Sequence, residues 1–213
     1  MSTRLTAPAY VRLLEMADCN TVITTQSYDA IIKEIQEVKT VRSIPFLTRN
    51  EYRDVAAPVF QRDHDLEKEA KKVAWIIHSS GSTGFPKPIF LSNLQVLANF
   101  AKSLCKRTFC TSPLFHSHAL MEVGRCIFAK KPIFLPNHSY PVTRQNLIDA
   151  MKVAEPEMLS AVPYVLKLMT ETEEGIELLT KPDVVLFAGS GCPEDLGDQL
   201  VEKGVNLVAN YGA

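Results

Sequence analysis

The sequence predicts an α/β fold with a mostly parallel sheet and helices on both faces. Short runs of β-branched and apolar residues alternate with stretches of helical period along almost the whole chain. Such alternation favours parallel strands joined by helices that lie on the sheet. No repeat or low-complexity block interrupts the series. We therefore expect one α/β unit over residues 1–213.

Strands are expected where apolar and β-branched residues cluster between turn residues. These runs cover residues 21–25, 44–48, 73–77, 89–91, 109–112, 133–135, 158–160, 184–187 and 205–208. Helices are expected where apolar residues recur at intervals of three and four. These stretches are residues 9–17, 27–38, 92–104, a segment ending near 129, and residues 143–154, 163–171, 174–179 and 193–203.

Local signals predict two helix starts and the faces that these helices bury. Ser27 is the expected N-cap of a helix that places Ile31, Ile32, Ile35 and Val38 on one face. Residues 92–95, Ser-Asn-Leu-Gln, have the spacing of a capping box. The buried stripe of the helix that follows is expected to consist of Leu94, Leu97, Ala98, Ala101 and Leu104.

Composition excludes several classes of protein. An apolar fraction of 46% and a charged fraction of 22% are ordinary for a water-soluble protein, and a net charge of −1 favours neither nucleic acid nor anionic membrane as a partner. Residues 1–213 do not begin with a basic stretch followed by an apolar core, and they contain no apolar run of about 18 residues, so we expect neither secretion nor a membrane span. The five cysteines include no C-x-x-C pair and are expected to be free thiols. We expect a cytoplasmic protein.

The most informative segment is residues 78–88, HSSGSTGFPKP, between two expected strands. Its glycines allow main-chain N–H groups to turn toward one point, its hydroxyls add donors, and Lys87 adds positive charge. The segment is not a G-x-x-x-x-G-K-[ST] loop, because Gly84 is followed by Phe85. A flexible surface linker is the alternative, but linkers have no reason to combine this order with flanking strands. We interpret the segment as a loop that binds a polyphosphate.

This segment resembles the signature loop TSGSTGxPKG of the adenylate-forming superfamily, which includes acyl-CoA ligases and peptide-synthetase adenylation domains. The resemblance implies that ATP is held by His78, Ser79, Ser80, Gly81, Ser82, Thr83, Gly84 and Lys87, with catalytic roles for Thr83 and Lys87. Pro88 departs from the usual glycine and stiffens the exit of the loop. A buried histidine with a main-chain partner is an equal alternative for His78.

Three further segments resemble family motifs in the same order, each at the carboxyl end of an expected strand, where open parallel sheets bind ligands. The turn Gly189, Ser190, Gly191 resembles the wall of the family's adenine pocket, although a glycine-rich turn before a helix is an equal alternative. Asn210, Tyr211 and Gly212 resemble the start of a motif whose tyrosine stacks on adenine. The segment PLFHSHAL, residues 113–120, resembles the lining of the pocket for the substrate.

The expected substrate contacts are Phe115 and His116. Peptide-synthetase domains place an aspartate for an α-amino group where this chain has His116, and an unpaired ammonium there would be costly. His116 and His118 would point the same way on a strand, but no further ligand at convincing spacing completes a metal site, so we expect none. Cys192 lacks a predicted base and is expected to be structural.

The resemblance implies ATP-dependent activation of a carboxylic acid, without an α-amino group, to an acyl-adenylate. It covers nearly the whole chain but only the middle of the family's large N-terminal domain, most resembling fungal peptide-synthetase-like enzymes. The complete enzyme is expected to use Mg²⁺ with ATP or AMP, to carry a small C-terminal domain that is absent from residues 1–213, and to pass the acyl group to CoA or a carrier domain. The alternative is an inactive, truncated paralogue that at most binds nucleotide.

Overall fold

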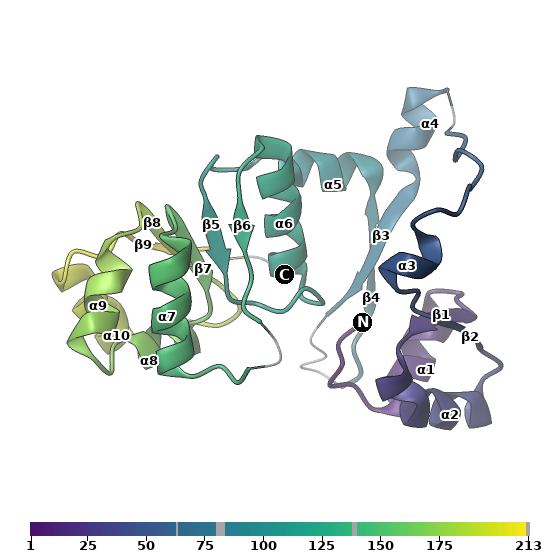
Figure 1. Cartoon of the computed structure of the whole chain (residues 1–213), viewed down its shortest axis with the longest axis horizontal. Helices are drawn as coiled ribbons and strands as arrows, with labels where there is room; N and C mark the ends of the chain where they lie inside the picture. The colour runs from purple at the N-terminus through teal and green to yellow at the C-terminus, as the bar shows by residue number, and fades with distance from the viewer. Residues whose placement is uncertain (63, 80–83, 138–139, 212–213) are drawn as a thin grey trace. The chain divides into compact units, whose positions relative to one another are not determined.

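The computed structural model describes residues 1–62, 64–79, 84–137 and 140–211 (Figure 1). Contacts divide the chain into two compact units, Met1–Gln95 and Val96–Ala213. The sequence analysis expects one unit. The division follows from the strand pairing, because within the described residues the strands of each unit pair only with strands of the same unit.

The N-terminal part of unit 1 is a small α/β layer. Two parallel strands, β1 (Thr21–Thr24) and β2 (Arg42–Pro45), accompany α1 (Ala7–Met16) and α2 (Asp29–Val38). The buried cluster consists of Ala7, Tyr10, Val11, Leu14, Ile32, Ile35 and Val41. The face predicted for α2 is therefore right at Ile32 and Ile35, but Val38 is 75% exposed.

The predicted cap of α2 is wrong. Ser27 lies inside a short 3₁₀ turn, η1 (Gln26–Tyr28), and the N-cap of α2 is Tyr28. The hydroxyl of Ser27 lies 2.8 Å from Thr25 Oγ1. The 3₁₀ turn tightens the chain before the helix, so the N-cap of α2 lies one residue later than the serine signal indicates.

An antiparallel hairpin completes unit 1. After α3 (Arg49–Tyr52) and α4 (Leu66–Lys71), strand β3 (Val73–His78) pairs with β4 (Pro88–Ser92). The capping box is confirmed, because Gln95 N donates to Ser92 Oγ and Ser92 N donates to Gln95 Oε1 at 2.8 Å. This reciprocal pair starts α5 (Asn93–Phe100) directly after β4.

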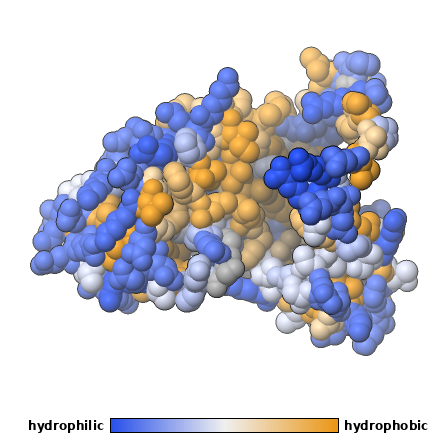
Figure 2. All heavy atoms as spheres, in the orientation of Figure 1, coloured by the Kyte–Doolittle hydropathy of each residue, from blue (hydrophilic) through white to orange (hydrophobic). Residues whose placement is uncertain are grey.

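The buried stripe predicted for α5 is wrong. Leu94 and Leu97 are 62% and 56% exposed, whereas Val96 is buried. Phe100 lies against Gly124, where a Cβ atom would come within 1.9 Å of its ring. The side of α5 that carries Val96 and Phe100 therefore faces the helix that contains Gly124, and Leu94 and Leu97 face outward. Hydrophobic residues gather on the surface in this region, over α6 (Ser117–Ala129) (Figure 2).

Unit 2 is built on a five-stranded sheet in which every pairing is parallel. Its spatial order is β6-β5-β7-β8-β9. The strands are β5 (Thr108–Cys110), β6 (Ile133–Phe134), β7 (Met158–Ala161), β8 (Val184–Phe187) and β9 (Leu207–Ala209). The expected strand at residues 205–208 begins later, and Val205 is a core residue before it.

Helices cover both faces of this sheet, which confirms the predicted fold class. On one face, Phe109, Leu159 and Val185 pack with the apolar residues of four helices. These are α7 (Arg144–Ala154), α8 (Pro163–Met169), α9 (Glu173–Thr180) and α10 (Glu194–Glu202). All four residues of β7 are buried, as a strand covered on both faces requires. The inward face predicted for α7, with Leu147, Ile148 and Met151, is confirmed.

Candidate functional site

The segment of residues 78–88, which is predicted to bind phosphate, closes on itself at its two ends. Ser79 N donates to Lys87 O at 2.9 Å, and Lys87 N donates to Ser79 Oγ at 3.0 Å. These bonds continue the hairpin beyond the pair of His78 and Pro88. The predicted contacts Ser80, Gly81, Ser82 and Thr83 lie outside the described residues. The main chain thus brings Ser79 and Lys87 together, and we call this pair the neck of the loop.

The side chain of Lys87 has no acidic partner within the described residues. The residue is exposed, and none of the ion pairs found there includes its ammonium. Gly84, which precedes Lys87 in the same segment, has a φ of +133°, a conformation that L side chains rarely adopt. Among the described residues, the neck therefore carries a positive charge without an acidic partner, in a segment whose backbone conformation favours glycine at position 84.

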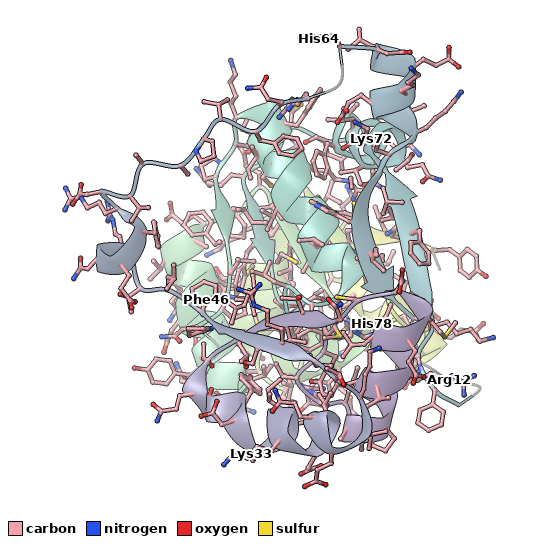
Figure 3. The ribbon with its side chains drawn as sticks, turned by 90° about the vertical axis from the view of Figure 1, so that its right-hand side faces the viewer. Arg12, Lys33, Phe46, His64, Lys72 and His78 are labelled. Carbon is pink, nitrogen blue, oxygen red and sulfur yellow. The ribbon has the colours of Figure 1, made fainter. Side chains whose placement is uncertain are left out.

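His78 has main-chain partners at both ring nitrogens. Ser2 N donates to His78 Nε2 at 3.0 Å, so the proton is on Nδ1, which donates to Ser79 O at 2.8 Å. Figure 3 shows Lys72 and His78 at opposite ends of β3. Main-chain partners of this kind are those of the alternative given for His78 in the sequence analysis. Both ring nitrogens are occupied, so neither is open to a nucleotide.

The other segments of the predicted site all belong to unit 2, where they leave the sheet at one edge. PLFHSHAL follows β5, the turn at Gly189 follows β8, and Asn210 follows β9. Because the strands are parallel, their carboxyl ends share this edge. The chain reverses its direction of progress across the sheet between β5 and β7, which is the topological switch point where such sheets bind ligands.

The predicted substrate residues lie at the start of α6 (Ser117–Ala129). His116 is the N-cap, and its ring centroid lies 4.6 Å from that of Phe115. His118 lies in the first turn of α6, so the two histidines do not have the strand arrangement in which both rings would point the same way. No cluster of three metal-ligating side chains occurs in the described part of the chain.

His118 is the residue that the sequence analysis did not assign. Its Nε2 lies within hydrogen-bond distance of Ser160 Oγ, and Ser160 is fully buried on β7. Ser160 O also accepts a hydrogen bond from Thr111 N at 2.9 Å. Burial, followed by the charges of Arg125 and His116, lowers the pKa of His118. The environment thus favours a neutral imidazole that links α6 to β7. The sequence analysis missed this contact because His118 and Ser160 lie 42 positions apart in the sequence.

The turn after β8 needs glycine at one position only. Gly189 has a φ of +92°, and a Cβ atom there would lie 3.5 Å from Val162 Cγ1. An added Cβ at Gly191 would meet nothing within 4 Å. The backbone at Gly191 therefore faces open space, whereas Gly189 is set by the conformation of the turn. Tyr211 is 99% exposed, and Gly212 lies outside the described residues.

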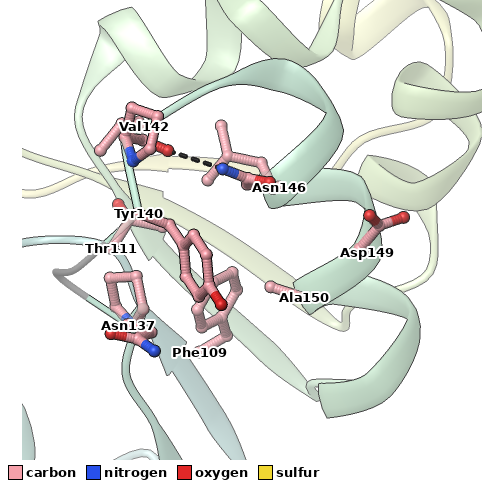
Figure 4. A pocket seen from close by; sticks show the side chains of 11 residues that line it. Phe109, Thr111, Asn137, Tyr140, Val142, Asn146, Asp149 and Ala150 are labelled. Atoms are coloured by element: carbon pink, nitrogen blue, oxygen red, sulfur yellow. Dashed lines mark hydrogen bonds between the residues drawn. The ribbon is translucent and has the colours of Figure 1, made fainter.

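A pocket of about 220 Å³ opens beside the carboxyl end of β5. Phe109, Tyr140 and Ala150 line it, and Asn146 Nδ2 donates to Pro141 O at its rim (Figure 4). Phe115 and His116 do not line it. The pocket thus lies on the β6 and α7 side of the sheet edge, away from the predicted substrate residues.

The cysteines are free thiols, as expected. Burial, and then the nearby charge of Asp195, raises the pKa of Cys192. Both effects disfavour the thiolate, the form that acts as a nucleophile. This agrees with a structural role for Cys192.

The model of the AMP-binding enzyme family matches residues 1–213. The chain belongs to this family. ATP-dependent activation of carboxylic acids, generally with Mg²⁺, is the chemistry of the family. Enzymes of this kind often deliver the acid to CoA or to a carrier domain.

Fungal members of the family are similar in sequence. A carboxylic acid reductase of Neurospora crassa is 27% identical over 231 residues, 97% of this chain and 22% of that protein. A non-canonical non-ribosomal peptide synthetase of Acremonium egyptiacum is 27% identical over 227 residues, 100% of this chain and 21% of that protein. The chain thus spans about a fifth of the length of the curated relatives it matches.

Solved structures of family members share the fold. A Mycobacterium tuberculosis fatty acyl CoA synthetase has a TM-score of 0.70 at 23% identity, over 100% of this chain and 43% of that one. An anthranilate CoA ligase in complex with anthranoyl-AMP has a TM-score of 0.77 at 16% identity, over 100% and 43%. None of the described helices of this chain has the length and apolar character to cross a bilayer.

Proposed function

We propose that this chain binds ATP and takes part in activating a carboxylic acid to an acyl-adenylate. The carboxylate attacks the α-phosphate of ATP, a phosphorus–oxygen bond forms, and pyrophosphate leaves. The observation that carries the proposal is the neck of the loop, where Ser79 pairs with Lys87 and the Lys87 ammonium has no carboxylate partner within the described residues.

Lys87 would hold the β- and γ-phosphates, and the donors of residues 79–84 would complete the grip. Charge-assisted hydrogen bonds of this kind contribute about 1.5–3 kcal/mol each. Little covalent chemistry is required of the protein in such a transfer, because positioning and charge stabilisation lower the barrier. Lys87 and Thr83 are accordingly our candidates for catalysis.

Mg²⁺ would neutralise part of the phosphate charge when it is bound. The described residues offer no cluster of three histidine, cysteine or carboxylate side chains for a metal. We therefore assign no residue of this chain as a magnesium ligand and derive no step through the ion.

The adenosine would lie at the carboxyl edge of the five-stranded sheet. Gly191, with open space above its backbone, suits a flat base that lies against the main chain. Asn210 and the exposed ring of Tyr211 follow β9, where they would read the polar edge of adenine and stack on its face. Ser190 and Gly212 complete the set that the resemblance assigns.

The acid is proposed to lack an α-amino group. His116 is exposed at the start of α6, at the position where an aspartate would hold an ammonium. A histidine offers an ammonium no full negative charge, so its desolvation would be uncompensated. Aryl, keto and fatty acids fit this condition, and the acceptor of the acyl group would be CoA, a carrier domain or a reductase partner.

The test is ATP–pyrophosphate exchange with a panel of carboxylic acids, measured on the gene product that carries this chain, together with ATP titration of residues 1–213. Exchange that depends on a non-amino acid supports the proposal. ATP binding without exchange for any acid would instead support a catalytically silent nucleotide-binding protein. Exchange that requires an α-amino acid would contradict the assigned substrate class.

A further inference from the structure

Both ends of the phosphate loop contact the N-terminal segment of unit 1. At the entry, Ser2 N donates to His78 Nε2 at 3.0 Å across 76 positions of sequence. At the exit, the guanidinium carbon of Arg12 lies 5.3 Å from the centroid of the Phe85 ring. Ser2 precedes α1 and Arg12 lies on it, so one helix and its lead-in meet the loop on both sides.

The entry contact belongs to a continuous series of hydrogen bonds. Tyr10 Oη on α1 donates to Ser2 O at 2.5 Å, and both residues are buried. Ser2 N then binds His78, whose Nδ1 donates to Ser79 O. Ser79 in turn exchanges two bonds with Lys87. Side-chain and main-chain hydrogen bonds thereby connect α1 to Lys87, the residue proposed to bind phosphate.

The contact between Arg12 and Phe85 at the exit of the loop also restricts Lys87. Phe85 is 45% exposed, and its ring carries the Arg12 guanidinium over its face. Pro86, between Phe85 and Lys87, is buried and has a fixed φ. Holding the Phe85 ring therefore restricts the direction in which Lys87 leaves the loop.

We propose that Ser2, Tyr10 and Arg12 are positioning residues that hold the neck of the phosphate loop in the conformation that binds ATP. This inference rests on the proposed function of Lys87. The physical reason is preorganisation, because a loop that is ordered before binding loses less conformational entropy when the ligand arrives. The positioning contacts should therefore change the affinity for the triphosphate of ATP. They should not change the affinity for AMP, which has no β- and γ-phosphates.

The experiment compares ATP, pyrophosphate and AMP binding to the 213-residue chain by titration calorimetry. Arg12→Gln removes the cation from the ring and should weaken ATP and pyrophosphate binding about two- to fivefold, the effect of one exposed cation–π contact. AMP binding should not change. Arg4→Gln is the matched control, since Arg4 is an exposed arginine of the same segment. It should leave all three affinities unchanged.

A second variant and a second measurement test the entry contact. Tyr10→Phe keeps the buried ring but removes the hydroxyl that donates to Ser2 O. Hydrogen exchange of the free chain should then become faster in the peptide of residues 76–92, as it should in Arg12→Gln. Phe85→Leu removes the ring that Arg12 contacts. Because Arg12→Gln and Phe85→Leu break the same contact, the double variant should bind ATP no more weakly than the weaker-binding of the two single variants.

The outcomes separate the two proposals. If the unchanged chain binds neither ATP nor pyrophosphate, the proposed function fails, while hydrogen exchange still decides whether α1 holds the loop. If Arg12→Gln and Tyr10→Phe leave both ATP affinity and exchange unchanged, the positioning role is overturned. An equal loss of ATP and AMP affinity would also overturn it, because that pattern reports a general loss of structure.

Discussion

His118 Nε2 on α6 lies within hydrogen-bond distance of Ser160 Oγ on β7, 42 positions later in the sequence. The pair joins the segment after β5 to the neighbouring strand β7 at the switch point of the sheet. Burial, with the charges of Arg125 and His116, lowers the pKa of His118 below its ordinary value of 6.5. The neutral form of the imidazole is consequently favoured at this edge of the sheet.

Stability should depend on pH through His118. The unfolded chain binds a proton at this histidine near pH 6.5, whereas the folded chain binds it only at lower pH. The contribution is therefore present above pH 6.5 and is lost as the pH falls through the lowered pKa. Urea unfolding between pH 7.5 and 5 should show a smaller loss of stability in His118→Gln than in the unchanged chain. His64→Gln, at an exposed position, should keep the full loss.

Glu122→Gln should destabilise the protein only slightly at pH 7.5. Burial raises the pKa of Glu122, and the partly opposing charge of Arg125 does not reverse the shift. A raised pKa means that the stabilising contribution of this group is present at low pH and is lost as the pH rises through that pKa. Glutamine at position 122 carries no charge, so the free-energy cost of burying the carboxylate is removed. The unfolding free energy of Glu122→Gln at pH 7.5 should therefore fall by less than that of a variant that removes Arg125, the less buried partner of the pair.

Arg125→Met is the contrasting variant for this pair. It leaves the buried Glu122 carboxylate without its ion-pair partner and should cost about 3 kcal/mol in urea unfolding at pH 7.5. A larger loss in Glu122→Gln than in Arg125→Met would show that the carboxylate itself stabilises the fold.

Lys87→Ala should weaken ATP binding at least about tenfold, since it removes a charge-assisted contact with the phosphates. Titration of ATP into the 213-residue chain measures the effect. Lys33→Ala is the control, because Lys33 is an exposed lysine on α2 (Figure 3). Equal ATP affinity in Lys87→Ala and the unchanged chain would refute the assignment of the loop.

Gly189→Ala and Gly191→Ala should differ in stability. Gly189 has a positive φ, and an L residue there is expected to cost about 1–2 kcal/mol. Gly191 has open space at the Cβ position and no positive φ, so alanine should change the unfolding free energy by less than about 0.5 kcal/mol. Thermal or urea unfolding of the two variants compares them directly. Equal costs would contradict a conformational role specific to Gly189.

Local sequence signals predicted those parts of the fold that local interactions decide. The capping box at Ser92 and Gln95 needs only four consecutive residues, and it forms as expected. The inward face of α7 is read correctly because its apolar residues follow one helical stripe. The outward leucines of α5 were misassigned, because the face that a helix buries depends on its neighbour, here Gly124 against Phe100.

The sequence by itself determined the family, the alternation of strands and helices, and the loop that carries Lys87, since these depend on the order and spacing of neighbouring residues. Only the tertiary structure decided which distant groups meet. Ser2 reaches His78, and His118 reaches Ser160, because packing brings together backbone and side chains that lie far apart along the chain. Hydrogen bonds act over about 3 Å, so no pattern of local spacing contains them.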